Sequence, residues 1–282
     1  MPFDVDGDGA LDLISARAVK PLSPLTPSAG ELVWLKQPSA APFAPQSLPW
    51  KETVLKGGPW APDVCFTAPV SLRSDSDSQI FYTSFFTGGG LAMLQCSGCA
   101  GAAPSATWAS ANLTLAVLDA AIGPAFDVAV VDLNGDGVSD LLVTNHADNA
   151  TAPHIASQVV AYVAPPPGSS LADASAWSKH VLAEGFLIRE PGPNQAAPGE
   201  ASAHLLPGAA KPFILVSGDG EQRLSLLQPA TSAAGDWNYS RSEVFDCRGT
   251  TGKQAAHQFG GSLYVFLPCY DAGTIQVFIV EA

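Results

Sequence analysis

Two acidic nine-residue segments, 4–12 and 132–140, constrain the fold of this 282-residue chain more than any other feature. They read Asp-Val-Asp-Gly-Asp-Gly-Ala-Leu-Asp and Asp-Leu-Asn-Gly-Asp-Gly-Val-Ser-Asp, with side-chain oxygens at positions 1, 3, 5 and 9. Oxygens at this spacing repel one another unless a hard cation lies among them, and Gly at position 6 permits the sharp turn that wraps a loop around Ca²⁺. An EF-hand would have Glu at position 12, where Ser15 and Val143 stand. Because both segments run directly into apolar residues, we expect calcium loops that lead into strands rather than helices.

The charge balance excludes two classes of partner. The chain has 26 Asp and Glu against 13 Lys and Arg, a formal charge of -13, whereas nucleic acids and anionic membranes require a basic face. No apolar run approaches the ~20 residues of a membrane-spanning helix. The N-terminal Met-Pro-Phe-Asp lacks the apolar stretch of a signal peptide.

The order of loop and then strand recurs along the chain. The residues that open the strand after each loop lie 50 to 72 residues apart: Asp12, Gln79, Asp140, Pro212 and Ser262. A strand-like run follows each of them, at 13–16, 80–86, 141–145, 213–217 and 263–267. A second apolar run comes next, at 32–35, 91–94, 159–163, 224–227 and 275–280. Four units then open a further strand with a tryptophan: Trp50, Trp108, Trp177 and Trp237.

Short strands repeated at this period, with an innermost strand before the loop as at 126–131, are typical of β-propeller blades. A β-sandwich with fortuitous spacing is the alternative. We therefore predict an all-β fold, a single β-propeller domain over 1–282 with about five four-stranded blades. The approximate blades are 1–60, 61–121, 122–198, 199–250 and 251–282.

The first and last of these blades are expected to be incomplete. Only residues 1–3 precede the first loop, which leaves no innermost strand, and the last unit ends without a Trp strand. A fragment of a longer propeller, or a truncated gene model, explains both ends. A five-bladed ring closed by the two incomplete ends is the alternative.

The segments 126–145 and 3–14 resemble the FG-GAP/VCBS-repeat β-propellers, which are best known from integrin α-subunit heads. Propellers of this family commonly have seven blades. The resemblance implies two Ca²⁺ sites with side-chain ligands and one backbone carbonyl each. The implied ligands are Asp4, Asp6, Asp8, Asp12 and the Ala10 carbonyl in the first loop, and Asp132, Asn134, Asp136, Asp140 and the Val138 carbonyl in the second.

The other units depart from this pattern. In unit two, 71–79, Arg73 stands at position 3 and would supply the positive charge itself, so we predict no metal there. The loops of units four and five, 207–211 and 258–261, contain no carboxylate.

Cysteine usage indicates an oxidising compartment. Zinc bound by Cys96 and Cys99 would need a second ligand pair, and Cys247 and Cys269 are too far apart for a zinc knuckle. We expect disulfides Cys96–Cys99 and Cys247–Cys269, with Cys65 free and buried. The glycosylation sequons point the same way, to an extracellular or secretory-pathway glycoprotein or an ectodomain: Asn112, Asn149 and Asn238.

Two histidines are the candidates for catalysis. His204 and His257 lie near the ends of two consecutive innermost strands, where they would line a central funnel and could bind a transition metal or act as acid and base. Hydrogen-bonded channel residues are the simpler interpretation. A sugar-ulose dehydratase family uses a propeller of this repeat type, which supports an enzyme only by analogy. We expect His146 at the surface and His180 exposed by strand alternation.

Other polar and aromatic residues have structural explanations. Asp63 and Asp127 precede two innermost strands and are either a second carboxylate layer or turn caps. The strand-opening tryptophans are expected to pack in the core, while Trp60 is the better candidate for an exposed contact. Sequence motifs of hydrolases, zinc proteases and nucleotide-binding folds do not occur.

Taken together, these patterns predict a calcium-binding β-propeller that serves as an extracellular binding or adhesion module for a protein or carbohydrate ligand. The alternative is a carbohydrate-directed enzyme, dehydratase- or lyase-like, with His204 and His257 in the funnel. A third possibility is a scaffold that only spaces other domains.

Overall fold

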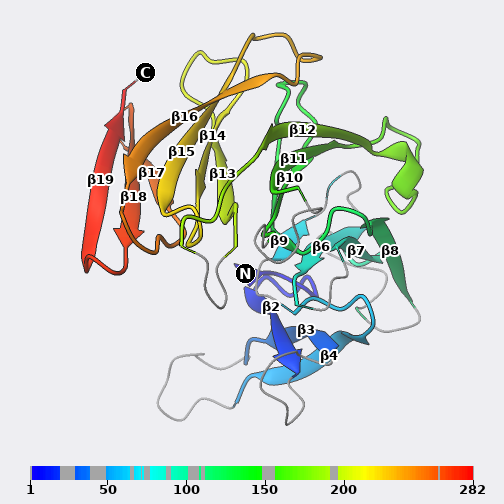
Figure 1. The fold of residues 1–282 in the computed structure, drawn as a ribbon. Helices are drawn as coiled ribbons and strands as arrows, with labels where there is room; N and C mark the ends of the chain where they lie inside the picture. Colours follow the sequence, from blue (N-terminus) through cyan, green and yellow to red (C-terminus); the bar gives the residue numbers. More distant parts are fainter. Residues whose placement is uncertain are drawn as a thin grey trace. The chain divides into compact units, whose positions relative to one another are not determined.

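The computed structural model describes residues 2–19, 29–38, 49–63, 67–70, 72, 77–86, 90–100, 108, 112–147, 156–190, 196–259 and 261–281. These residues form five antiparallel sheets (Figure 1). The described residues contain no helix with the length and apolar character that a membrane crossing needs.

The strands follow one another along the chain. The first sheet contains β1 (Pro2–Phe3), β2 (Asp12–Val19), β3 (Ala29–Lys36) and β4 (Lys51–Gly58). The second contains β5 (Thr67–Val70), β6 (Ser78–Ser84), β7 (Gly90–Cys96) and β8 (Leu113–Asp119). The third contains β9 (Ala125–Val131), β10 (Asp140–Asn145), β11 (Gln158–Val163) and β12 (Ser178–Glu184), with the short 3₁₀ helix η2 (Ala174–Ala176) before β12. The fourth contains β13 (Glu200–His204), β14 (Phe213–Ser217), β15 (Arg223–Pro229) and β16 (Tyr239–Asp246), and the fifth β17 (Ala255–Phe259), β18 (Ser262–Cys269) and β19 (Thr274–Val280).

Within every sheet the strands lie side by side in chain order, which is the meander of a β-propeller blade. The predicted fold class, all-β with sheets of the propeller-blade type, is confirmed. The fifth sheet has three strands, as expected from its missing Trp strand. The first sheet differs from the prediction, because β1 is a two-residue innermost strand in which Pro2 and Phe3 pair with Leu13 and Asp12.

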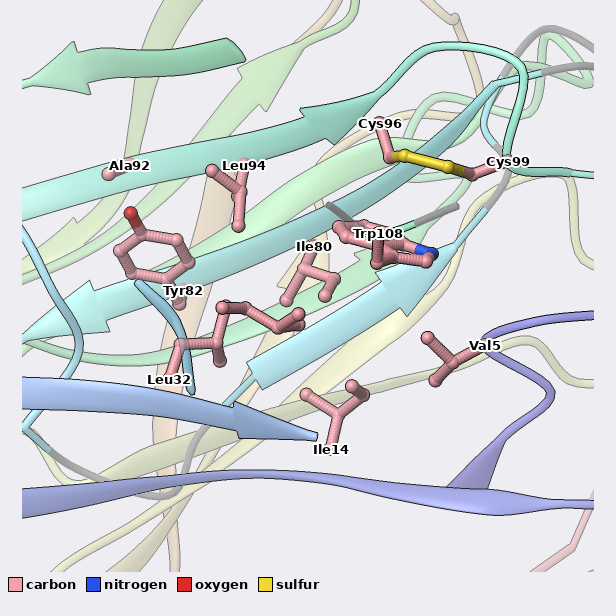
Figure 2. Packing of buried hydrophobic residues seen from close by; sticks show 11 residues of the cluster. Val5, Ile14, Leu32, Ile80, Tyr82, Ala92, Leu94, Cys96, Cys99 and Trp108 are labelled. Atoms are coloured by element: carbon pink, nitrogen blue, oxygen red, sulfur yellow. A yellow bond between two sulfur atoms is a disulfide. The ribbon is translucent and has the colours of Figure 1, made fainter. Parts of the chain in front are cut away.

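The chain divides into two compact units, Met1–Val128 with Pro165–Trp177, and Ala129–Ala164 with Ser178–Ala282. The grouping of all five sheets into a single domain stays a prediction. In the first unit, apolar side chains of the first two sheets form one buried cluster (Figure 2). Val5, from the first acidic loop, belongs to this cluster together with Ile14, Leu32 and Trp108. The acidic loop is thus anchored by an apolar side chain in the core of its unit.

The second unit has two clusters of the same kind. One joins the third and fourth sheets and contains Leu133 of the second acidic loop. The other joins the fourth and fifth sheets. Burial between successive sheets explains the apolar runs of the sequence, because each sheet has two faces to cover.

Two local predictions have clear outcomes. Both expected disulfides, Cys96–Cys99 and Cys247–Cys269, are formed, while Cys65 lies outside the described residues. Trp50 and Trp177 directly precede β4 and β12, as predicted, but β8 begins at Leu113, so Trp108 does not open its strand. Trp108 is buried in the core cluster instead.

Candidate calcium-binding loops

The first-position aspartate folds each acidic loop around its own carboxylate. Asp4 accepts hydrogen bonds from the amides of Gly7 and Gly9, at 2.8 and 3.0 Å. Asp132 accepts the equivalent two bonds from glycine amides of the second loop, at 2.7 and 2.8 Å. All four glycines have φ between 71° and 86°, a left-handed conformation that glycine adopts without steric cost.

The ninth-position aspartate ties each loop to the end of the third strand. Asp12 is buried and accepts hydrogen bonds from the amides of Val5 at 3.3 Å and Gln37 at 2.7 Å. Asp140 is equally buried and accepts the two corresponding bonds at 3.2 and 3.1 Å. The position of each loop is therefore set by the first residue of the strand that follows it.

The fifth-position aspartate completes the match between the loops. Asp8 accepts from the Ala10 amide at 2.9 Å, and Asp136 accepts from the Val138 amide at 2.8 Å. The same five backbone-to-carboxylate hydrogen bonds thus form in each loop, although the two loops are far apart in the sequence.

The first loop gathers carboxylate oxygens in one place. Asp4, Asp6 and Asp8 each offer an oxygen within 4.8 Å of the others. Asp6 Oδ1 is buried and has no hydrogen-bond partner among the described residues. Because an unpaired buried carboxylate oxygen is costly and Ca²⁺ binds oxygen ligands, this donor set fits a calcium ion.

Lys36, the last residue of β3, contacts the first loop, and this contact was not predicted from the sequence. Its ammonium donates to Asp6 and, at 2.9 Å, to Asp8 Oδ2. These contacts raise the pKa of Lys36 and lower the pKa of Asp8. Lys36 follows Leu35, which pairs with Leu13, so strand register brings the lysine beside the loop.

In the second loop an apolar residue takes the place of this lysine. Tyr162 pairs with Leu141 as Leu35 pairs with Leu13, so Val163 occupies the place equivalent to Lys36. Burial raises the pKa of Asp140 to about 6, and the negative charges of Asp136 and Asp132 add to the shift. Asn134 lies within the loop and donates to Asp136 at 2.9 Å.

The described residues of the corresponding segments in units two and four make other contacts. Gln79 accepts from the Leu72 amide at 2.9 Å, the same closure that Asp12 makes, while Arg73 lies outside the described residues. In unit four the Lys211 ammonium donates to the backbone carbonyl of Asp236 and lies 5.5 Å from the ring centre of Trp237.

No described contact joins the two candidate catalytic histidines. His204 Nε2 lies 2.7 Å from Ser202 Oγ, and burial lowers the pKa of His204. The Ser202 hydroxyl also accepts from Gln254, just ahead of β17, whereas His257 is exposed on β17. Among the described residues, the group of three or more His, Cys, Asp or Glu side chains suited to a metal is the Asp4 cluster, which contains neither histidine.

Other polar residues differ from their predicted places. His146 was expected at the surface but is buried: its Nδ1 lies 2.7 Å from the Pro198 carbonyl oxygen and its Nε2 3.3 Å from Asp219 Oδ1. Pro198 and Asp219 lie far from His146 in the sequence, so the alternation of exposed and buried residues along a strand could not predict that His146 is buried. His180 is half-buried rather than exposed, because its ring stacks on Trp237 at 4.7 Å.

Two further residues near the second sheet have backbone partners. Trp60 is half-buried and its carbonyl accepts from the Tyr82 hydroxyl. Asp63 accepts from the Phe85 amide at 2.6 Å, so it acts as a cap across the sheet.

Antiparallel sheets whose strands follow one another in chain order are sheets of the β-propeller type, and in the first and third sheets an acidic loop joins the first strand to the second. Residues 125–161 match the FG-GAP repeat. The match contains β9, the second acidic loop, β10 and the beginning of β11. It confirms, for this segment, the resemblance inferred from the sequence.

Wider comparisons give distant similarities. Among curated proteins, no match was found. A GH43_1 enzyme from Xanthomonas citri is similar at 13% identity and a TM-score of 0.39, over 99% of this chain and 86% of that chain. An engineered GH43 glycoside hydrolase with endo-xylanase and exo-arabinofuranosidase activity is similar at 11% identity and a TM-score of 0.37, over 94% of this chain and 49% of that chain. At these TM-scores neither structure assigns a fold or an activity to this chain.

Proposed function

We propose that this chain is a calcium-stabilised module of the β-propeller type that binds a protein or carbohydrate ligand outside the cell. One Ca²⁺ would be bound in each acidic loop. The observation that carries the calcium assignment is the shared scaffold of five hydrogen bonds, which holds 4–12 and 132–140 in the same shape. A shape that recurs with oxygens at the same four positions favours a common ligand over two unrelated turns.

The side chains that would hold the ions are those predicted from the sequence. They are Asp4, Asp6, Asp8 and Asp12 with the Ala10 carbonyl in the first loop, and Asp132, Asn134, Asp136 and Asp140 with the Val138 carbonyl in the second. A bound ion supplies positive charge among these oxygens and so relieves their mutual repulsion. Because Asp12 and Asp140 are the first residues of β2 and β10, the ions would fix where these strands begin.

The proposal of an extracellular location rests on the cysteines and on charge. The two disulfides support this location, because disulfides form and persist mainly in oxidising compartments. Extracellular calcium near millimolar also suits modest sites of this kind. Asn238, in one of the glycosylation sequons, is exposed. The FG-GAP repeat supports the proposal of an adhesion role, and so do the loops between the strands, because binding residues lie disproportionately on loops.

The test is calcium titration of the metal-free full chain by calorimetry, followed by thermal unfolding with and without chelator. We expect two ions per chain, and each site to add about 2.7 kcal/mol of stability at a calcium concentration of ~100 Kd. Melting that is indifferent to chelator would defeat the calcium assignment. A tightly bound transition metal instead of calcium would favour the enzyme alternative with His204 and His257.

Ligand binding is tested separately. The calcium-loaded chain is passed over arrays of extracellular proteins and of glycans, with chelator-treated chain as the control. Saturable binding that is lost on chelation is expected. Turnover of a carbohydrate by the wild-type chain would support the enzyme alternative.

A further inference from the structure

The first strand of the fourth sheet places a serine beside a histidine. Ser202 and His204 lie two residues apart on β13, so both side chains point to the same face of the sheet. Ser202 Oγ lies 2.7 Å from His204 Nε2, the distance of a direct hydrogen bond between a hydroxyl and an imidazole. Both residues are half-buried, so each keeps part of its surface open to solvent. The pair lies outside both acidic loops.

A glutamine from the segment before β17 orients the serine hydroxyl. Gln254 Nε2 donates to the Leu215 carbonyl oxygen at 3.1 Å, and this contact identifies the amide nitrogen because a carbonyl oxygen only accepts. Gln254 is buried, and its Oε1 accepts from the Ser217 hydroxyl, so both ends of the amide are held. The same Nε2 donates to Ser202 Oγ at 2.9 Å. The serine thus accepts one hydrogen bond from Gln254, and its own hydrogen can point at His204 Nε2.

The histidine is in the protonation state that a base requires. Burial lowers the pKa of His204, so its imidazole is neutral at pH 7. A neutral imidazole has one acceptor nitrogen, and this is Nε2 when Nδ1 carries the proton. The ring also contacts Phe213, with the two ring centres 5.6 Å apart. A serine hydroxyl is a weak nucleophile by itself and is activated by an adjacent base of this kind.

The surroundings of His204 restrict the class of substrate. In a catalytic triad a buried carboxylate accepts from the second ring nitrogen and stabilises the imidazolium that forms. Among the residues that the structure describes, no carboxylate is hydrogen-bonded to His204. The imidazolium would therefore be less stable than in a triad, and the pair suits a leaving group that departs easily. Esters meet this condition better than amides, because an alcohol or a phenol departs more readily than an amine.

We infer that Ser202 is a nucleophile for acyl esters, with His204 as its general base. Ser202 Oγ forms a bond to the ester carbonyl carbon while its proton passes to His204 Nε2. The bond from that carbon to the alcohol oxygen then breaks, and Nε2 returns the proton to this oxygen, so the alcohol leaves. Water attacks the acyl carbon in the same way, with its proton passing through Nε2 to Oγ, and the carboxylic acid is released. This activity goes beyond the calcium-dependent binding module and uses none of its proposed ligands.

The test is covalent labelling of the full chain with a fluorophosphonate probe, which forms a stable bond to an activated serine oxygen. Mass spectrometry identifies the labelled residue, and hydrolysis of p-nitrophenyl acetate is followed in parallel. We expect one label per chain, on Ser202, and ester hydrolysis that the label blocks. Ser202→Ala should abolish labelling. His204→Gln keeps the nucleophile but removes its base, and should slow both reactions about a hundredfold or more.

The matched control is Ser242→Ala, which removes an exposed serine hydroxyl on β16. This variant should react like the wild type, and circular dichroism checks that all three variants fold. A wild-type chain that is not labelled, or is labelled elsewhere, would overturn the inference even if a variant fails to fold. Equal labelling rates in the wild type and in folded His204→Gln would also overturn it. Chelation of calcium distinguishes the two proposals, because melting that is indifferent to chelator defeats the calcium assignment and leaves a labelled Ser202 unaffected.

Discussion

Lys36 Nζ lies 2.9 Å from Asp8 Oδ2 and also donates to Asp6, so the first acidic loop contains its own cation. Four aspartates and this lysine give the first loop a formal charge of −3. The second loop reaches the same charge of −3 differently, with Asn134 in place of an aspartate and Val163 in place of the lysine. The lysine thus offsets the additional carboxylate of Asp6.

Removal of this lysine should strengthen calcium binding in the first loop. Lys36→Val reproduces the second loop at that place and frees Asp6 and Asp8 to face the ion. Because the pair is partly exposed, we expect a gain of roughly three- to tenfold in affinity for one of the two sites. Calorimetric titration measures the change, and Val163→Lys is the reciprocal variant, with a weakened second site. An unchanged affinity in Lys36→Val would show that the ammonium does not compete with the ion.

Loss of a ligand should abolish one part of the calcium-dependent stability. Asp136→Ala removes a carboxylate of the second loop, and we expect about half of the melting-temperature drop caused by chelator to disappear. At saturation this part corresponds to ~2.7 kcal/mol. Differential scanning calorimetry with and without chelator measures it. The control is Glu190→Ala, an exposed carboxylate outside both loops, which should leave the chelator effect intact.

Alanine substitutions at two glycines of the second loop distinguish the cost of backbone strain from the cost of a steric clash. Gly135 and Gly137 have φ of 77° and 83°, so alanine is strained at both. A Cβ at Gly135 would lie 2.2 Å from the Ala210 carbonyl oxygen, whereas a Cβ at Gly137 meets nothing within 4 Å. We expect Gly137→Ala to cost about 1 kcal/mol of unfolding free energy and Gly135→Ala clearly more. Urea unfolding compares the two, and equal costs would contradict the close approach of the 206–210 turn.

The buried imidazole of His204 should make stability depend on pH. Burial lowers its pKa below the ordinary value, so the unfolded chain takes up a proton at this site at a higher pH than the folded chain. The unfolding free energy therefore decreases as the pH is lowered from about 6.5, the ordinary pKa of histidine, toward the folded pKa. Raising the pH over the same range restores it. His204→Gln should flatten this part of the profile between pH 7 and pH 5, measured by urea unfolding at each pH. A profile identical to that of the wild type would exclude His204 as the source.

The local features of the fold follow from neighbouring residues in the sequence. The acidic loops, the strands that they open and the meander of each sheet were predicted from spacing and apolar alternation, because these patterns act over a few residues. The predicted ligands Asp12 and Asp140 lie where β2 and β10 begin. Trp108 was misplaced because its packing into the first cluster, and not its distance from a strand, determines its position.

The sequence by itself determined that this protein is a chain of blade-like sheets with two oxygen-rich turns, because turn chemistry and strand period are local properties. Only the tertiary structure decided which side chains meet these elements. Lys36 reaches the first loop through the register of β2 and β3. His146 lies beside Asp219, which comes after β14 in the sequence. Val244 is exposed on β16, the edge strand of the fourth sheet. Such contacts join residues far apart in the chain, and their geometry depends on how whole strands pair and pack.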